Sequence, residues 1–445
     1  MHAGNAAGAA GIGDLDTLCR MMAAHGVREL VVKELSANDN SKNQVYLGGS
    51  FDILNVLPVG TVTGEADAGG GTGHLRASLP LDWLRADGTV SPAPGAQLVL
   101  YPQYPEVRLS GFLKGASGAP NDLMTQRQPG RLLFLGVTND RRTIGWVASH
   151  DSPLATQVRA LPVTGKGGVF TRIQMAAAGL ARDRLLDRLR TLAAAGWCAS
   201  TRLSAGGIAR PCIGTNCGGY TLEAHFGIVP NGKAEPDFEG WEIKAHGAGV
   251  GWKPAGAVTL MTPEPTGGFY KEAGCEAFVR KFGYPDKKNI PDRLNFSSPH
   301  RHPGVNATTG LRLGFSGYDP ATHKITNAAG GFSLLDSTGA EAATWHFAGL
   351  LQHWNKKHAN AAYVPCKVRK LPSQQYAYGQ SVRLAEGTDF LRFLRQLADG
   401  TISYDPGIKL TGASTSKSRV KARSQFRINA FGITSLYSAV ETVVL

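Results

Sequence analysis

A nine-residue stretch, Pro236-Asp-Phe-Glu-Gly-Trp-Glu-Ile-Lys244, constrains this chain more than any other part of its sequence. Apolar and charged residues alternate over its last four positions, and alternation with a period of two is typical of a β-strand that has one face in a core. Side chains two positions apart on a strand face the same side, so Glu242 and Lys244 are expected beside each other, with Ile243 turned into the core. The stretch therefore predicts a strand that presents a carboxylate and an amine together.

This set of side chains suits phosphodiester hydrolysis with a divalent ion. Asp237, Glu242 and the backbone carbonyl of Ile243 are oxygen ligands of the kind that Mg²⁺ prefers. A bound ion lowers the pKa of water and neutralises the developing charge, and Lys244 can then reach the attacking water or the scissile phosphate. Glu223, on an expected helix upstream, is a candidate third carboxylate. The bare spacing also arises by chance, and an exposed strand with solvated charges is the alternative interpretation.

The charge of the chain points to a polyanionic partner. Lys and Arg number 47 against 34 Asp and Glu, a formal charge of +13. Such a surplus favours binding to phosphates, because their neutralisation releases counterions. No basic amphipathic helix and no run of about 20 apolar residues is present, so we expect no membrane partner.

The cysteines and the N-terminus predict a cytoplasmic protein of a bacterial host. The chain begins without the charged start and apolar run of a signal peptide. Its six cysteines are scattered; Cys212 and Cys217 lie five apart, but no second pair with zinc-binding spacing follows. We therefore expect all six to be reduced thiols without a function.

The length of 445 residues predicts two domains, with a boundary near residue 170. Before it, short apolar runs broken by Gly, Pro and Asn at 29–47 and 97–147 indicate strands of a barrel-like or sandwich domain over residues 1–170. After it, leucines at helical spacing over 180–192 predict an amphipathic helix. Further helices are expected near 342–358 and 387–399, so residues 171–445 are predicted to form a mixed α/β domain.

Several motifs of the second domain resemble the MvaI/BcnI family of restriction endonucleases. The motifs are Gly219–Ala224, Phe226–Ile228, Pro236–Lys244, Met261–Pro265, Asp292–Phe296, Trp345–Lys357, Tyr404–Lys409 and Arg423–Arg427. The resemblance implies an α/β PD-(D/E)xK restriction-endonuclease-like domain in which Asp237, Glu242 and Lys244 are catalytic and Glu223 joins them. It also implies a Mg²⁺-dependent monomer that cleaves double-stranded DNA, with a cognate DNA methyltransferase in the host. The motif spacing is closer to the MvaI branch, which implies the sequence CCWGG, where W is A or T.

A basic segment near the C-terminus is the best candidate for DNA contact. Five basic residues and no acid lie between Thr411 and Arg427, and such a run suits a loop that follows phosphates, with an Arg able to pair with guanine. For any single residue, a solvated surface charge is the alternative. Asp405 can accept from a cytosine amino group, although Tyr-Asp-Pro-Gly is also an ordinary turn. The basic candidates are Lys409, Lys417, Arg419, Lys421, Arg423 and Arg427.

The first domain carries a second resemblance, over short stretches. Lys33–Asp39 and Gln44–Leu47 are similar to the start of the EcoRII N-terminal effector domain, a mostly-β DNA-binding pseudobarrel of the plant B-three type. The resemblance implies a type IIE enzyme, whose residues 1–170 bind a second copy of the site. The expected second arm runs from Arg108 to Asp122 and departs from the pattern, because its segment Gly115–Asp122 is poor in Arg. A strand end with an Asx turn is the alternative for Lys33, Ser36 and Asn38. The candidate DNA-binding residues here are Lys33, Ser36, Asn38, Asp39, Arg108, Lys114 and Asn121.

Two other functions remain open from the sequence. A structure-selective repair or junction nuclease would use the same chemistry but cut branched DNA regardless of sequence. A non-catalytic DNA-binding regulator would give no Mg²⁺-dependent product, and carboxylates beside phosphate give a binder no advantage.

Overall fold

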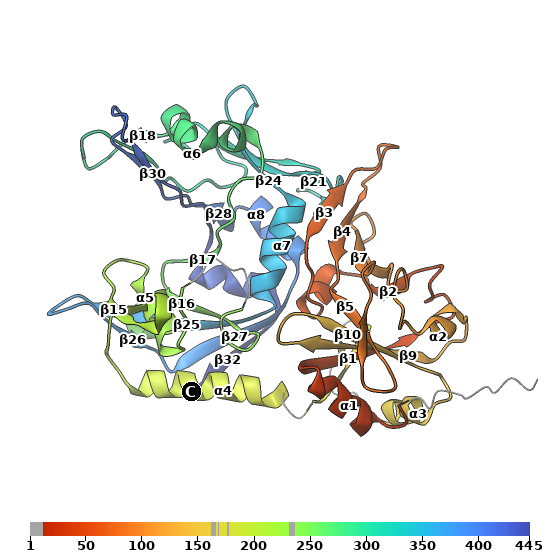
Figure 1. Ribbon diagram of the computed structural model, residues 1–445. Helices are drawn as coiled ribbons and strands as arrows, with labels where there is room; N and C mark the ends of the chain where they lie inside the picture. Colours follow the sequence, from red (N-terminus) through yellow and green to blue (C-terminus); the bar gives the residue numbers. More distant parts are fainter. Residues whose placement is uncertain (1–11, 162–165, 168, 176–177, 231–235) are drawn as a thin grey trace, which may run out of the picture. The chain divides into compact units, whose positions relative to one another are not determined.

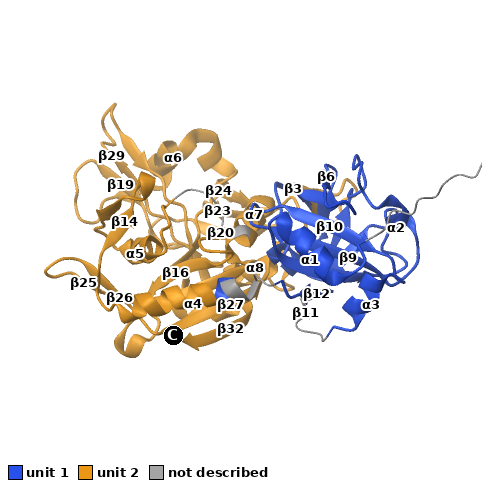
Figure 2. Ribbon diagram, turned by 60° about the horizontal axis from the view of Figure 1, so that its bottom comes forward, with its two compact units in different colours: residues 1–62, 76–182 blue, residues 63–75, 183–445 orange. Residues whose placement is uncertain are grey.

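The computed structural model describes residues 12–161, 166–167, 169–175, 178–230 and 236–445 (Figure 1). The chain divides into two compact units, residues 1–62 with 76–182 and residues 63–75 with 183–445 (Figure 2). Each unit is described by itself. The assignment of separate roles to residues 1–170 and 171–445 stays a prediction.

The first unit is mostly β, as the short apolar runs predict. One sheet has the strand order β11-β12-β1-β9-β10-β5-β6, and a second has the order β2-β8-β7-β4-β3. Strands β1 (Val27–Leu35) and β9 (Arg131–Thr138) pair antiparallel. β9 is almost entirely buried, and β1 is buried over Leu30–Lys33, because their apolar residues pack on both faces. The other elements are β2 (Val45–Gly48), β3 (Val62–Glu65), β4 (His74–Ser78), β5 (Leu81–Leu84), β6 (Val90–Pro92), β7 (Gln97–Tyr101), β8 (Glu106–Ser110), β10 (Thr143–Ala148), β11 (Lys166–Gly167), β12 (Phe170–Ile173), α2 (Asn121–Thr125) and η1 (Phe51–Asn55). Of these, residues 63–65 of β3 and 74–75 of β4 belong to the second unit.

Two helices complete the core of this unit. Helix α1 (Leu15–Ala24) buries Leu18 and Met22, and α3 (Pro153–Arg159) buries Leu154, in one cluster with β1 and β9. Helix α1 was not among the predicted elements. The sequence nevertheless carries a helix-start signal there, because Asp14 accepts a hydrogen bond from the Thr17 amide as an N-cap and apolar residues follow at helical spacing.

The second unit is built around a sheet that contains the charged strand of the motif, β16 (Glu242–Gly247). The strand order is β13-β26-β25-β27-β32, and β16 pairs parallel with β25 (Asn360–Arg369). Helix α4 (Ala178–Ala194) follows the predicted leucine pattern and buries Leu185, Leu189 and Leu192 in the core of this sheet. Each such leucine contributes about 1.5–3 kcal/mol on burial.

The helix predicted near 342–358 is wrong in its first part. Residues Glu341–His346 form β24, which pairs with β23 (Gly331–Leu335), and α7 begins only at Phe347 and ends at His358. The run Ala342–Trp345 is buried throughout, Thr344 included, and so short a buried segment shows no periodicity that distinguishes a strand from a helix. The helix expected near 387–399 is α8 (Phe390–Ala398), capped by Asp389.

The remaining elements of the second unit form smaller sheets with the orders β17-β31-β28, β18-β19-β29-β30, β20-β23-β24, β14-β15 and β21-β22. None of the helices in the described ranges is long and apolar enough to cross a membrane. The bounds not yet given are β13 (Cys198–Ala199), β14 (Thr201–Leu203), η2 (Ala205–Gly207), β15 (Ala209–Pro211), α5 (Cys217–His225), η3 (Val250–Trp252), β17 (Ala257–Met261), α6 (Gly268–Phe282), β18 (Tyr284–Pro285), β19 (Arg293–Phe296), β20 (Arg312–Ser316), β21 (Tyr318–Asp319), β22 (Lys324–Ile325), β26 (Gln375–Tyr378), β27 (Ser381–Thr388), β28 (Ile402–Tyr404), β29 (Ile408–Thr411), β30 (Arg419–Lys421), β31 (Phe426–Asn429), η4 (Ala430–Leu436) and β32 (Tyr437–Val444).

Candidate active site

A tight turn places Asp237 beside the strand that follows it. Phe238 and Trp241 exchange backbone hydrogen bonds of 2.9 and 2.8 Å, and the two residues between them adopt positive φ. Gly240, at φ 88°, takes this conformation without strain, which explains the glycine of the motif. The turn folds the chain back, so that an Asp237 carboxylate oxygen accepts a hydrogen bond of 3.0 Å from the amide of Ile243.

Glu242 and Lys244 lie together on one side of β16, as the alternation predicts. The Lys244 Nζ atom donates a hydrogen bond of 2.8 Å to Glu242 Oε1. The intervening Ile243 is 4% exposed and packs in the core of the sheet with Trp241. The strand is therefore fixed by its apolar side while its other side carries the two charges.

A third carboxylate, Glu223, lies on helix α5. Its carboxyl is half-buried and lies near enough to Asp237 and Glu242 for their charges to raise its pKa. The helix is held against β16 through the same core, in which Leu222 is fully buried. The four residues predicted to form the site thus come together from three segments: α5, the turn and β16.

A second lysine, which the sequence analysis did not single out, also faces this site. Lys357, near the end of α7, places its Nζ atom 3.6 Å from Glu242 Oε1. The next residue, His358, is completely buried, accepts or donates hydrogen bonds at both ring nitrogens and stacks on Trp354. These contacts fix the end of α7. The motif Trp345–Lys357 contains this lysine but does not predict its contact with Glu242.

The carboxylates of the site differ in their affinity for protons. Burial and the charge of Glu242 raise the pKa of Asp237 to about 6, and burial with the charges of Asp237 and Glu242 raises the pKa of Glu223 to about 7. Burial also acts on Glu242, but Lys244 and Lys357 outweigh it and hold the pKa of this carboxyl below its usual value. One acid of the cluster is therefore firmly ionised, while two resist ionisation in the absence of a further cation.

These residues fit a hard divalent cation. Glu242 Oε2 is buried and has no hydrogen-bond partner within the described part of the chain. Burial, together with the charges of neighbouring carboxylates, raises the pKa values of Glu223 and Asp237, so the site favours a further positive charge beside the two lysines. Over the described residues no compact group of three or more His, Cys, Asp or Glu side chains has metal-binding geometry. That finding does not conflict with Mg²⁺, which is commonly held by one or two carboxylates and several waters.

The raised pKa values predict a pH-dependent need for metal. Below its pKa, each protonated carboxylate must lose a proton before it can bind a cation. The Mg²⁺ concentration for half-maximal cleavage should therefore fall by about a hundredfold per pH unit below pH ~6, by about tenfold between pH ~6 and ~7, and then level off. Titration of cleavage against Mg²⁺ at a series of pH values will measure this. In Glu223→Gln the plateau should begin nearer pH ~6, the value that remains for Asp237. A requirement for Mg²⁺ that does not vary with pH would contradict these assignments.

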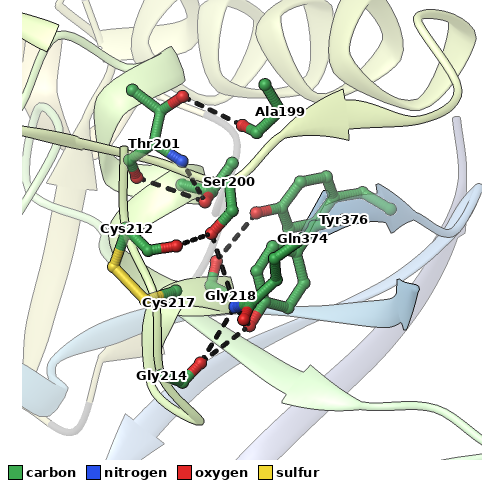
Figure 3. Close-up of a disulfide and its surroundings, with 11 residues drawn as sticks. Ala199, Ser200, Thr201, Cys212, Gly214, Cys217, Gly218, Gln374 and Tyr376 are labelled. Atoms are coloured by element: carbon green, nitrogen blue, oxygen red, sulfur yellow. Dashed lines mark hydrogen bonds between the residues drawn. A yellow bond between two sulfur atoms is a disulfide. The ribbon is translucent and has the colours of Figure 1, made fainter. Parts of the chain in front are cut away.

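The expectation that all six cysteines are reduced is wrong. Cys212 and Cys217 form a disulfide (Figure 3), and Cys19, Cys198, Cys275 and Cys366 are free. A turn through Gly214 returns the chain and brings the two Cα atoms within 5.8 Å, a closure that the spacing of five did not reveal. Disulfides are uncommon in reducing compartments, so this one does not support the predicted cytoplasmic location.

The disulfide joins the segment before α5 to the first residue of that helix, so its removal should loosen the helix that carries Glu223. For so short a loop, Cys212→Ser is expected to lower the free energy of unfolding by about 2 kcal/mol. Urea unfolding of the protein, followed by tryptophan fluorescence with and without reductant, will measure the effect. Reductant should reproduce the loss in the wild type and add nothing in the variant; equal stability of all four samples would exclude a structural role.

Five of the seven candidate residues of the first unit gather around one cavity of about 650 Å³. They are Lys33, Ser36, Asn38, Asp39 and Arg108, together with Asn43, Gln44 and Tyr46. Lys33 does not offer a free charge there, because it is buried and forms an ion pair with Asp39. Lys114 and Asn121 are exposed and do not line the cavity.

The basic candidates of the second unit are divided between a hairpin and an ion pair. In the hairpin β29–β30, Lys409 lies directly opposite Lys421, and Arg419 opposite Thr411, with all three cations exposed. Like charges at opposite positions repel, which favours an anionic partner. Lys417 and Arg423 are also exposed. Arg427 instead donates to Asp405 over 2.7 Å, so these two candidates neutralise each other in the free protein.

The comparisons with known proteins agree with this site. A sequence profile described as the MvaI/BcnI restriction endonuclease family matches residues 186–437, more than half of the chain and all four site residues. The second unit thus contains a restriction-endonuclease-like domain. More narrowly, the chain belongs to the MvaI/BcnI restriction endonuclease family.

Two solved structures also align with part of the chain. The restriction endonuclease MvaI in complex with cognate DNA substrate has 16% identity and a TM-score of 0.45, and MvaI in the absence of DNA has 15% and 0.31. Each alignment covers 59% of this chain and 98% of the other. No curated protein matches the chain.

Proposed function

We propose that this protein is a Mg²⁺-dependent type II restriction endonuclease that hydrolyses DNA phosphodiester bonds at the site formed by Glu223, Asp237, Glu242 and Lys244. The observation that carries the proposal is the grouping of three carboxylates and a buried lysine from three separate segments. A bound Mg²⁺ would supply a nucleophilic water and would neutralise charge on the phosphate. Family membership supports a nuclease over a non-catalytic regulator.

In this proposal each residue of the site has a separate role. Asp237 and Glu242 would hold the cation, with the carbonyl of Ile243 as a further oxygen ligand. Lys244, whose Nζ atom lies 2.8 Å from Glu242 Oε1, would orient the attacking water and stabilise the phosphate charge. Glu223, with its raised pKa, is suited to hold a water bound to the cation or to accept its proton.

We further propose that the enzyme recognises CCWGG and is of type IIE, with the first unit binding a second copy of the site. The first unit resembles the EcoRII effector domain. Joined to an MvaI-like nuclease, it gives a domain organisation that resembles UbaLAI. The cavity that gathers Lys33, Ser36, Asn38, Asp39 and Arg108 supports a binding role for the first unit. Monomeric action on double-stranded DNA, a bacterial cytoplasmic location and a cognate methyltransferase belong to the same proposal.

Plasmids with zero, one or two CCWGG sites test both parts of this proposal. Fragments that map to CCWGG, formed faster with two sites or with an added CCWGG oligonucleotide, are expected. Cleavage at CCWGG with no such stimulation would remove the effector role of the first unit. Cleavage of branched or unrelated DNA, with none at CCWGG, would favour the structure-selective nuclease and overturn the restriction assignment.

A further inference from the structure

A small hairpin beside the catalytic helix carries two arginines that the proposed mechanism does not use. Strands β14 and β15 pair so that Arg202 lies directly opposite Arg210, and both side chains are exposed. Opposite residues of an antiparallel pair are only about 5 Å apart at their Cβ atoms, so two positive charges there repel.

Nothing in the neighbouring sequence balances these charges. Between Arg188 and Leu222 the chain has four arginines and no Asp or Glu. Among the described residues, neither Arg202 nor Arg210 forms an ion pair with an acid. A hairpin that concentrates positive charge without a counter-charge is suited to an anionic ligand.

The hairpin is fastened to helix α5 at three points. The hydroxyl of Thr221 accepts a hydrogen bond of 3.0 Å from the amide of Thr201 and donates one of 3.2 Å to the carbonyl of the same residue. The third attachment is the disulfide, which ties the residue after β15 to the first residue of α5 (Figure 3). The Ser200 hydroxyl in addition donates a hydrogen bond to the carbonyl of Cys212 and accepts one from the Gln374 amide. The arm therefore keeps a fixed position relative to that helix.

The fixed position lies close to the catalytic carboxylate. Arg202 packs its guanidinium 5.1 Å from the ring of Tyr220, and Tyr220 and Glu223 are three residues apart on α5. Residues at this spacing are neighbours on the surface of a helix. A phosphate bound by the arginines would thus lie within a few nucleotides of the reacting one.

We propose that the β14–β15 hairpin is a rigid arm that binds the sugar–phosphate backbone of duplex DNA through Arg202 and Arg210. The inference rests on the proposed nuclease function and assigns a specific substrate contact to it. Guanidinium groups suit phosphate oxygens, and the disulfide keeps the arm aligned with the site.

Salt-dependent binding of a fluorescent CCWGG duplex to the full-length protein in EDTA tests the arm. Arg202→Ala/Arg210→Ala should reduce the slope of log K against log salt concentration by about 2, and Arg210→Ala alone by about 1. Arg202→Lys/Arg210→Lys should keep most of the slope. Arg190→Ala is the matched control, because this exposed arginine of the same acid-free run already forms an ion pair with Asp187. The salt dependence of DNA binding by this variant should equal that of the wild type.

The possible outcomes distinguish a failure of the arm proposal from a failure of the proposed nuclease function. Arg210→Ala should unfold at the wild-type temperature, since this side chain is exposed, so its lower slope cannot reflect misfolding. Wild-type slopes in both alanine variants, or an equal loss in Arg190→Ala, would overturn the inference while the nuclease stands. Failure of the wild type to bind or cut duplex DNA would overturn the proposed function and the arm together.

Discussion

Lys244→Ala will lower the rate of DNA cleavage by about 10³-fold or more while leaving DNA binding intact, because it removes a charge that acts on the transition state. The lysine lies on β16 with its Nζ atom 2.8 Å from Glu242, and its side chain is only 14% exposed. Such a buried cation is held in place before the substrate arrives, so its loss is not replaced by solvent. Single-turnover cleavage with saturating Mg²⁺ measures the chemical step directly.

Two lysines of the chain serve as comparisons for this variant. Lys253 is exposed and close in sequence, and Lys253→Ala should cleave at the wild-type rate. Lys357→Ala, which removes the more distant cation 3.6 Å from Glu242, should show a smaller loss. If Lys244→Ala cleaves as fast as Lys253→Ala, the lysine has no role in catalysis.

Asp237→Asn and Glu242→Gln will change the stability of the metal-free protein in opposite directions. Asp237 has a folded-state pKa of about 6, above its ordinary value of 3.8, so its carboxyl favours folding at low pH and loses that contribution as the pH rises through ~4–6. Asparagine removes the charge but can still accept from the Ile243 amide. We expect Asp237→Asn to gain about 2 kcal/mol at pH ~8 in EDTA, and to match the wild type below pH ~4.

Glu242 behaves in the opposite way, because it is the ionised partner of Lys244. Replacing it leaves a buried cation with no carboxylate at hydrogen-bond distance, and Glu242→Gln should therefore lose about 3 kcal/mol at the same pH. Urea unfolding of both variants in EDTA gives the comparison. Added Mg²⁺ should stabilise the wild type and neither variant; the same sign of stability change in both would contradict the charge assignment.

The sequence predicted the site better than it predicted the fold around it. Glu242, Ile243 and Lys244 could be placed because period-two alternation is a local property of a strand. The turn that brings Asp237 to the Ile243 amide was also local, since Gly240 supplies its positive φ. The strand β24 was not predicted because Ala342–Trp345 is buried on both faces and lacks a period of two, and its pairing with β23 decides its conformation.

Features that depend on strand pairing or on one particular backbone path could not be predicted. Lys357 reaches Glu242 because α7 leads into β25, the strand beside β16, and this parallel pairing joins residues more than 100 positions apart. The Cys212–Cys217 bond depends on a backbone return through Gly214 that its spacing does not require. The acid-free run around Arg202 and Arg210 was visible in the sequence, but its meaning depends on the pairing of β14 with β15.

The most direct test of the central claim is cleavage of a linear duplex with a single CCWGG site by the wild type and by Asp237→Asn, each in Mg²⁺ and in EDTA. The account predicts two fragments, with ends at CCWGG, only for the wild type in Mg²⁺. Cleavage that persists in EDTA or in the variant would contradict the assignment of Asp237 and a divalent cation to the reaction.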